Sequence, residues 1–354
     1  MTEARDINQP VNAFDHFAHA WGEPDTPADF KTVAGDFQVE EILGFEPDGA
    51  GEHLCLFIEK RNLTTAAAMA HISASSGVPL RDISCAGIKD KTGITRQWLS
   101  LRLGLNKNLD PERLQTDKLR IIRCARNRRK IRRGSHRGNR FVIRLRQCER
   151  PASCFQEKLQ LIAGQGVPNY FGPQRFGHDG SNIAQIQDCF ARGRLPKDRF
   201  TRGMLLSAAR SWIFNAYLSQ RVSSGSWNQY QQGDYCILEG SSRGFSPAPD
   251  DQQISRRIEQ LDIHPAGPLW GRAQAAWMEQ FAGLRRQFPE LTAGLEKAGL
   301  EADWRALRMK VSEPLISDTD DGALMIEFTL GKGAYATCVL RELLKLNKRE
   351  TDSP

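Results

Sequence analysis

The hydrophobic periodicity of the chain changes twice, and this change restricts the possible folds more than any other feature of the sequence. Between residues 30 and 146, apolar side chains recur at every second position of several short segments, which is typical of strands. From residue 152 they recur at helical spacing, and beyond residue 306 the period of two returns. This order of segments predicts a second domain inserted into the first.

The first strand-rich segment is expected to hold several strands and one helix. Thr64 can cap the N-terminus of this helix, and Gly77 is expected to end it. An Arg- and Gly-rich stretch separates the last two strands, and we expect these strands to form a hairpin with a basic tip. The predicted strands lie near residues 30–43, 54–58, 83–88, 98–103, 119–124 and 140–146.

The helix-rich segment is punctuated by Pro and Gly. Connections are predicted at residues 167–177 and 264–271, and helices near residues 152–162, 182–192, 204–222 and 273–288. Strands near residues 306–311 and 324–330 and a helix at residues 336–346 follow. The predicted domain division is 1–164 and 311–354 for the two parts of the outer domain and 165–310 for the insertion.

The basic residues are concentrated in one stretch. The chain has 49 Lys and Arg against 42 Asp and Glu, and residues 120–146 contain twelve basic residues and no acidic residue. Such a cluster is expected of a surface that binds a polyanion. A solvated arm or a targeting signal is the alternative, but the stretch continues into alternating apolar residues, which favours a folded segment.

Several common classes of protein are not indicated. The eight cysteines form no CxxC pair and no Cys/His cluster with zinc spacing, so we expect a reducing compartment and no structural metal. No HExxH, GxSxG, Walker or dinucleotide pattern occurs. Without a leader or an apolar stretch of transmembrane length, a cytoplasmic protein with no membrane partner is expected.

One acidic residue stands among cations in residues 86–101, AGIKDKTGITRQWLSL. The periodicity predicts strand, polar loop and strand here, and Asp90 lies in the loop between Lys89 and Lys91. Neighbouring cations favour the ionised carboxylate, which would serve as a nucleophile or a base. A charged loop of this kind is also typical of a solvated turn, so the loop alone leaves both interpretations open.

Two further motifs differ from ordinary helix or strand patterns. RGNRF at residues 137–141 places Asn139 and Phe141 on one side of a strand, where the amide can contact a base edge and the ring can stack on a base. Phe141 by itself is more typical of a core position. NYFGPQRFG at residues 169–177 is expected to be a rigid junction with buried aromatic rings rather than an RNA-binding loop.

Together, these motifs resemble the TruD family of tRNA pseudouridine synthases, which isomerise uridine 13 of tRNA. The resemblance covers nearly the whole chain from residue 31 onward. It implies an α+β fold, in which a pseudouridine synthase catalytic domain with a mainly antiparallel β-sheet flanked by helices is interrupted by an inserted helix-containing TRUD domain. The matching motifs are GDFQVEE (35–41), AGIKDKTGITRQ (86–97), RGNRF (137–141), NYFGPQRFG (169–177) and GAYATCVLREL (333–343).

The resemblance also assigns roles to individual side chains. Asp90 occupies the position of the family's catalytic aspartate. Phe37, Asn139 and Tyr335 match its substrate-contact positions, so we expect them to bind the substrate. Phe141 falls where many other pseudouridine synthases carry a tyrosine near the aspartate, and it is expected to wall in the base.

Two lysines are expected to support Asp90. Lys31 looks like the basic partner of the family's aspartate, and Lys89 is adjacent to Asp90 in sequence. The chain departs from the family at two positions beside the expected site, because Gly331 stands where many members have proline and Gly93 where alanine is common. These departures concern the local geometry of the loops more than the matched reactive positions.

The resemblance implies an isomerase that needs no cofactor and no metal. Its implied substrate is tRNA, and residues 120–146 are expected to face the RNA. Two alternatives use the same features. A non-catalytic basic RNA-binding protein, such as an RNA chaperone or an assembly factor, would need the cations but not Asp90, and an RNA glycosidic-bond hydrolase would release free uracil.

Overall fold

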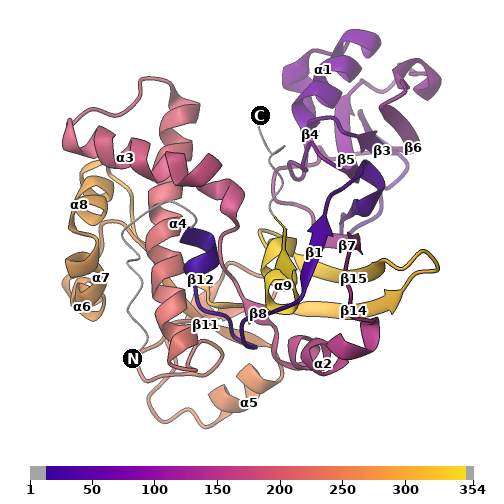
Figure 1. Cartoon of the computed structure of the whole chain (residues 1–354). Coiled ribbons are helices and arrows are strands. Elements are labelled where there is room, and N and C mark those ends of the chain that lie inside the picture. The colour runs from indigo at the N-terminus through magenta and orange to yellow at the C-terminus, as the bar shows by residue number, and fades with distance from the viewer. Residues whose placement is uncertain (1–12, 348–354) are drawn as a thin grey trace.

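The computed structural model describes residues 13–347, which form one large sheet and a helix-rich block beside it (Figure 1). The helices are α1 (Thr65–Ser76), α2 (Gln156–Gln165), α3 (Ser181–Ala191), α4 (Arg199–Ser223), α5 (Gln253–Glu259), α6 (Ala275–Gln280), α7 (Ala282–Gln287), α8 (Pro289–Lys297) and α9 (Ala336–Leu343). The strands are β1 (Pro27–Phe30), β2 (Phe37–Ile42), β3 (His53–Arg61), β4 (Ile83–Cys85), β5 (Ile94–Arg102), β6 (Leu119–Asn127), β7 (Gly138–Arg146), β8 (Val167–Pro168), β9 (Cys236–Leu238), β10 (Gly244–Phe245), β11 (Ile263–Leu269), β12 (Asp303–Ala306), β13 (Arg308–Met309), β14 (Val311–Asp318), β15 (Leu324–Gly331) and β16 (Lys345–Leu346).

The large sheet joins the two ends of the chain. Its strands follow the order β14-β15-β7-β2-β5-β3-β6, and β1, β4 and β16 pair beside this path. In Figure 1 the yellow strand β15 lies next to β7, with β14 on its other side, although the whole helix-rich block separates β15 from β7 in sequence. In the described part of this sheet, β2–β5 and β1–β16 are parallel pairs and the other pairs are antiparallel. The α+β class and the mainly antiparallel sheet are confirmed.

Several local predictions are also confirmed by the structure. Thr64 caps α1, because its hydroxyl oxygen accepts a hydrogen bond from the backbone N–H of Ala67 at 3.1 Å. Gly77 ends the helix with a φ of 69°, a conformation that glycine adopts without strain. On β7, Phe141 is buried on the face that meets the core, as its period of two predicts.

The predicted hairpin between the two basic strands is wrong. β6 pairs with β3 at one end of the sheet, whereas β7 pairs with β2 and β15. Each strand has the predicted periodicity, but the choice of partner depends on which apolar faces share a core, and proximity in sequence does not report this. The basic residues 128–137 therefore form a loop that connects two strands with β3, β5 and β2 between them.

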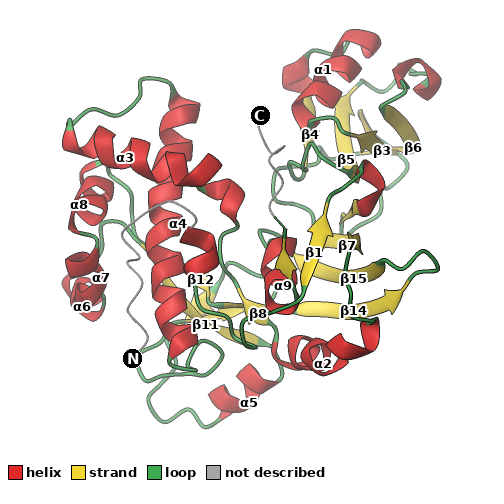
Figure 2. Cartoon of the chain, viewed as in Figure 1, coloured by secondary structure: helices red, strands yellow, loops and turns green. Residues whose placement is uncertain are grey.

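The helix-rich block is built around α4, the longest helix drawn in red in Figure 2. α3, α8 and β11 pack against α4, and β10, β9, β11 and β12 form a four-stranded sheet. The helices predicted near residues 182–192 and 204–222 are confirmed as α3 and α4. The helix predicted at residues 273–288 is divided into α6 and α7.

The predicted connection at residues 264–271 is wrong, because most of it belongs to β11. This strand contains Pro265 and Pro268, which lack a backbone donor. The two prolines do not prevent pairing, since β11 pairs with β9 along its first half and with β12 along its second half. The carbonyl of Pro265 also accepts a hydrogen bond from the backbone N–H of Leu307 at 2.8 Å.

The chain enters and leaves the helix-rich block at one place. β8 and β13 form a two-stranded antiparallel sheet in which Val167 lies opposite Met309. Gly166 has a φ of 76°, and a Cβ there would collide with the carbonyl oxygen of Met309, so the close approach requires glycine. The predicted division at residues 165 and 310 falls beside this pair and stays a prediction.

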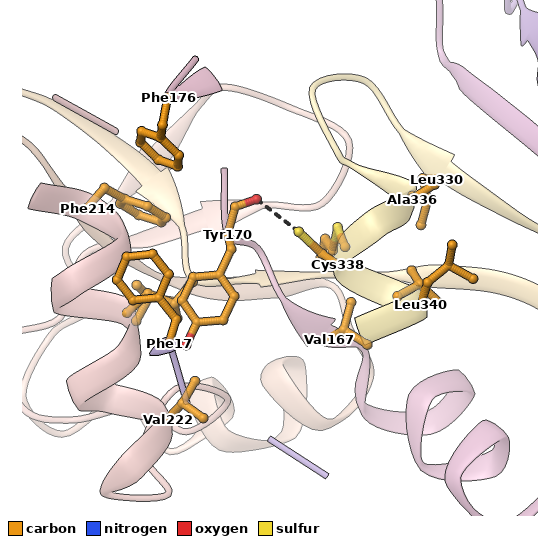
Figure 3. Close-up of a cluster of buried hydrophobic side chains, with 14 of the residues drawn as sticks. Phe17, Val167, Tyr170, Phe176, Phe214, Val222, Leu330, Ala336, Cys338 and Leu340 are labelled. Carbon is orange, nitrogen blue, oxygen red and sulfur yellow. Dashed lines mark hydrogen bonds between the residues drawn. The ribbon is translucent and has the colours of Figure 1, made fainter. Parts of the chain in front are cut away.

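In the junction motif at residues 169–177, the rings of Tyr170 and Phe176 are buried, as predicted, and Phe171 is half-buried. Figure 3 shows Tyr170 between Phe17 and Cys338, with Phe214 of α4 close by. The rings of Tyr170 and Phe17 stack with their centroids 5.4 Å apart, and Cys338 of α9 donates its S–H to the carbonyl oxygen of Tyr170 at 3.2 Å. One hydrophobic core therefore continues from the large sheet into the helix-rich block.

Candidate active site

The loop that carries Asp90 spans residues 86–93, between β4 and β5. The side chain of Asp90 is 47% exposed, and the Nζ of Lys31 donates a hydrogen bond to its Oδ2 at 3.2 Å. Lys31 has a φ of 60°, which is uncommon for a lysine, and its ammonium lies 4.0 Å from the ring centroid of Phe37. The structure thus brings together Asp90, Lys31 and Phe37.

Aromatic rings from adjacent strands form the surface beneath this group. Phe141 of β7 lies 6.2 Å from Phe37 of β2 and 5.4 Å from Phe328 of β15, measured between ring centroids. Phe37 and Phe141 are only 3% and 7% exposed. Phe328 stacks on the ring of Phe141, and the ammonium of Lys31 lies over the ring of Phe37.

A buried ion pair lies next to the aromatic rings. The Nζ of Lys89 is 2.5 Å from Oε2 of Glu41, whose other carboxylate oxygen accepts the backbone N–H of Trp98 at 3.1 Å. Lys89 thus contacts Glu41 rather than Asp90. Asn139 lies opposite Glu41 in the β2–β7 register, and its Oδ1 is buried with no hydrogen-bond partner in the described part of the chain.

The main chain of the Asp90 loop is tethered at several positions by β3, by the turn that follows β3 and by α1. Lys60 Nζ donates to the carbonyl oxygen of Asp90 at 2.6 Å, and Thr65 Oγ1 accepts the N–H of Lys89 at 3.0 Å. Asn62 is bonded to Gly93 twice, through its Oδ1 at 3.1 Å and through its backbone N–H at 3.0 Å. The backbone on both sides of the carboxylate is thereby held in one conformation.

A buried and a half-buried titratable group, Lys60 and His136, lie around this loop. Burial lowers the pKa of Lys60 to about 8, the charge of Asp90 opposes this change, and Lys89 adds to it. Burial also lowers the pKa of His136, and the charge of Lys89 lowers it further. The imidazole of His136 lies against Gly87, so both groups border the main chain that presents Asp90.

Tyr335 is anchored differently from the other predicted site residues. It lies at the N-cap position of α9, and Nη2 of Arg175 donates a hydrogen bond to its hydroxyl at 3.0 Å. Arg305 donates to the carbonyl oxygen of Gly333 at 3.2 Å and lies 4.0 Å from the ring of Phe171. Among the contacts of the described residues, no hydrogen bond or ring contact joins Tyr335 to the Asp90 loop directly.

The basic loop at residues 128–137 lies between these two parts of the site. Its Gly134 donates its N–H to the carbonyl oxygen of Ala86 at 2.7 Å. Lys332, on the turn before α9, reaches the carbonyl oxygen of the same Gly134 at 3.5 Å. The basic loop therefore contacts both the Asp90 loop and the turn that carries Tyr335.

The cations of residues 120–146 fall into two groups. Those on the strands include Arg123, Arg140, Arg144 and Arg146, which form ion pairs with acidic side chains. The cations of the loop are exposed and form no ion pair with a carboxylate in the described residues, and they are Arg128, Arg129, Lys130, Arg132, Arg133 and Arg137.

A cavity of about 560 Å³ adjoins the Asp90 loop on the side of the basic loop. Its lining includes the first residues of α1 and Ile88, two positions before Asp90. Lys130, Arg132 and Arg133 contribute the cations that line it. The cavity is thus bordered both by cations of the basic loop and by the loop that carries Asp90.

Sequence reasoning overlooked three residues that shape the site. Glu41 lies on the same face of β2 as the buried Val39, and Lys60 lies on the same face of β3 as the buried Ile58. A charged residue on the core-facing side of a strand was the signal that the sequence offered. Arg175 lies within the junction motif, but its contact with Tyr335 depends on the packing of segments distant in sequence.

No candidate metal-binding group and no candidate membrane-spanning helix is found among the described residues. Within residues 13–347, no group of three or more His, Cys, Asp or Glu side chains is placed to hold a metal ion. In the same range, none of the helices combines the length and apolar character needed to cross a membrane.

Comparison with known proteins gives consistent matches along the chain. The sequence model of a family described as tRNA pseudouridine synthase D (TruD) matches residues 14–197 and 191–343. The tRNA pseudouridine synthase D of Pseudomonas putida is 41% identical over 342 residues, which cover 95% of this chain and 96% of that protein. The protein of the same name from Methylococcus capsulatus is 40% identical over 338 residues, with 94% and 96% covered.

A solved structure agrees with the fold. A crystal structure from Methanosarcina mazei, described as a putative tRNA pseudouridine synthase D, superposes with a TM-score of 0.71 at 20% sequence identity. The superposition covers 96% of this chain and 98% of that chain. The large sheet and the helix-rich block are thus found together in a second protein of low sequence identity.

Proposed function

The chain belongs to the TruD family of tRNA pseudouridine synthases, which are isomerases that make pseudouridine, and from this premise we propose that it modifies uridine 13 of tRNA with Asp90 as the catalytic carboxylate. One observation carries the assignment of Asp90. Its carboxylate is accessible, is bonded to Lys31 at 3.2 Å, and stands on a loop whose main chain is tethered on both sides of it.

The reaction breaks the N-glycosidic bond of uridine, turns the uracil and rejoins it to the sugar through carbon. No electrons are gained or lost, and no external reactant enters. The Asp90 carboxylate starts the isomerisation by attacking the sugar or the base, or by removing a ribose proton. In each of these routes Lys31 orients the carboxylate, because its ammonium donates a hydrogen bond to Oδ2 of Asp90. Lys31 makes no such bond to Oδ1 among the described contacts.

The neighbouring residues provide contacts for the uracil ring. Phe37 and Phe141 wall in the base, and Asn139 offers a side-chain oxygen that has no hydrogen-bond partner among the described residues. Tyr335 adds a contact from the turn before α9. A uridine in folded tRNA is stacked or paired, so the enzyme must turn it out of the helix, at a cost of a few kcal/mol that contacts elsewhere on the RNA offset.

We propose that the exposed cations of the basic loop supply those contacts. Residues 120–146 as a whole are basic, but the strand residues Arg140 and Arg144 already have carboxylate partners. Substituting Arg132 and Arg133 by Gln should reduce the slope of log affinity against log salt by about 1.4 to 1.8, because each phosphate contact contributes roughly 0.7 to 0.9. Filter binding at several salt concentrations measures this slope. The matched control, Arg140→Gln with Arg144→Gln, should change it little, and equal changes in both variants would contradict the proposal.

The helix-rich block is proposed to be the inserted TRUD domain, with residues 1–164 and 311–354 forming the catalytic domain around it. The paired strands β8 and β13 support this division, since the chain passes between the two parts at that pair. A protein that acts on tRNA is expected in the cytoplasm, where tRNA is found.

The proposed function is tested by incubating the purified protein with an unmodified tRNA transcript and mapping pseudouridine. The wild-type protein should modify position 13, and Asp90→Asn should lower the rate at least about 1,000-fold while still binding tRNA, because the reacting group is lost and the RNA surface is kept. Asp117→Asn, which changes an exposed carboxylate elsewhere, is the matched control and should react normally.

Four outcomes would contradict the proposal in different ways. Modification at another uridine would remove the assignment of position 13. An active Asp90→Asn variant would remove the assignment of the carboxylate. Free uracil in place of pseudouridine would indicate glycosidic-bond hydrolysis, and tRNA binding without any reaction would indicate a non-catalytic RNA-binding protein.

A further inference from the structure

We propose that Lys60 is a positioning residue for this reaction, which holds the main chain of Asp90 from the interior of the sheet. The inference rests on the proposed function, since it takes Asp90 as the catalytic carboxylate. Lys60 would not touch the substrate. It acts through the peptide carbonyl of the residue that does.

The burial of Lys60 is the first observation. It is 1% exposed and lies on the same face of β3 as the buried Ile58 and Leu56. Its Nζ donates to the carbonyl oxygens of Leu63 and Asp90, both at 2.6 Å. In the described part of the chain no carboxylate lies within ion-pair distance of its Nζ, although the charge of Asp90 still acts on it. A buried ammonium without such a partner is costly, so an apolar side chain would suit this position better if only stability mattered.

The second observation is that Lys60 connects two segments of the chain. Its two acceptors belong to different segments, since Leu63 is in the turn before α1 and Asp90 is in the loop before β5. The ammonium therefore joins that turn to the proposed catalytic residue itself. Asn62 joins the same two segments at Gly93, so the turn sets the conformation of the loop at two points.

The charges around Lys60 point to the same role. Asp90 and Lys89 are the titratable groups that interact with it, and both lie in the loop. Its neighbours across the sheet, Thr95 on β5 and Leu119 on β6, are uncharged. Lys31 bonds to the carboxylate of Asp90 while Lys60 bonds to its carbonyl oxygen, so the two lysines hold the same residue at both ends.

The test compares Lys60→Met with the wild type in single-turnover modification of tRNA at saturating enzyme. Methionine keeps the length of the side chain and removes the charge and the donors. We expect the rate to fall about 10- to 100-fold, because a small displacement of a reacting group has effects of this size. The dissociation constant of tRNA, measured by filter binding, should stay within about twofold, because Lys60 is far from solvent.

The pH dependence of the rate separates positioning by the ammonium from a general structural role. Since burial lowers the pKa of Lys60 to about 8, the wild-type rate should decline above this pH. Lys60→Arg, which stays charged through this range, should lose the decline and serves as the second variant if Lys60→Met does not fold. Asn62→Ala removes a neutral tether of the same loop and should keep the decline.

The outcomes distinguish this inference from the proposed function. Wild-type activity that requires Asp90, together with an undiminished rate in Lys60→Met, would overturn the role of Lys60 and leave the proposed function intact. A decline above pH 8 that persists in Lys60→Arg would also overturn it. A wild-type protein that makes no pseudouridine would instead overturn the proposed function, and both variants would then be inactive with it.

Discussion

The loop that carries Asp90 and the turn that carries Tyr335 both present a proposed active-site residue, but they are anchored to different parts of the chain. The Asp90 loop is tethered by Lys60 of β3, by Asn62 of the turn that follows β3 and by Thr65 of α1. Tyr335 is tethered by Arg175, which lies in the junction to the helix-rich block. One half of the site is thus held within the sheet, and the other half is held from outside it.

Because the anchors differ, substitutions in the two regions should differ in how strongly they affect folding and activity. The Asp90 loop depends on buried polar contacts, which are costly to break because the groups left behind lose their partners in a medium of low polarity. The position of Tyr335 depends on two arginines, Arg175 and Arg305, that pack against Phe171. We therefore expect changes in the loop to affect folding strongly and changes near Tyr335 to affect activity more than folding.

The largest effect is expected for the ion pair beneath the loop. Lys89→Met leaves the carboxylate of Glu41, which is fully buried, without its partner, and this should lower the free energy of unfolding by about 3–5 kcal/mol. Urea unfolding measures the change. Arg140→Met breaks an ion pair of similar geometry with Glu327 at the surface and should cost about 0–1 kcal/mol. Equal losses of unfolding free energy in the two variants would show that burial does not make the Lys89–Glu41 ion pair more important for stability.

The next effect concerns the pH dependence of stability. The pKa of Lys60 is about 8 in the folded protein, below its ordinary value of 10.5, so the unfolded chain binds the proton more tightly. The cost of the buried charge is therefore fully present below pH 8 and is relieved as the pH rises towards 10.5. The free energy of unfolding of the wild type, relative to Lys60→Met, should increase by up to about 3 kcal/mol across this range. Urea unfolding at pH 7 and pH 10 tests this, and a constant difference would contradict it.

A smaller effect is expected from glycines in the two regions. Gly93 of the Asp90 loop has a φ of 121°, and a Cβ there would lie 2.5 Å from the carbonyl oxygen of Phe37. Gly93→Ala should therefore lower the free energy of unfolding by about 2 kcal/mol. Gly331, at the end of β15, has open space at the corresponding point, so Gly331→Ala should stay within about 0.5 kcal/mol. Thermal or urea unfolding that ranks the two variants in the opposite order would be inconsistent with this difference.

The smallest effect is expected at Tyr335 and should appear in activity. Arg175→Met removes the donor to the Tyr335 hydroxyl, and kcat/KM for tRNA should fall about tenfold, or about 1.4 kcal/mol. Tyr335→Phe should produce a similar loss. Because both variants remove the hydrogen bond between Arg175 and Tyr335, the double variant should lose little more than either single variant. Additive losses would show that Arg175 does not act through Tyr335.

Local features of the fold were predictable because their causes lie close together in the sequence. The helix between Thr64 and Gly77 follows from a capping hydroxyl and a terminal glycine, which act within one or two turns. The core-facing side of β7 follows from the period of two in Phe141 and its neighbours. The pairing of β6 and β7 was not predictable in this way, because strand partners are chosen by faces that meet only in the folded sheet.

The features of the candidate site can be separated in the same way, into those that the sequence predicts and those that depend on tertiary packing. By itself, the sequence determined the family, the α+β class, the basic loop and the choice of Asp90, because these depend on residue type and order. The tertiary structure decided that Lys89 pairs with Glu41, that Lys60 holds the carbonyl of Asp90 and that Arg175 reaches Tyr335. Burial and hydrogen bonding between distant segments set these contacts, and neither is defined until the sheet and the helix-rich block have packed together.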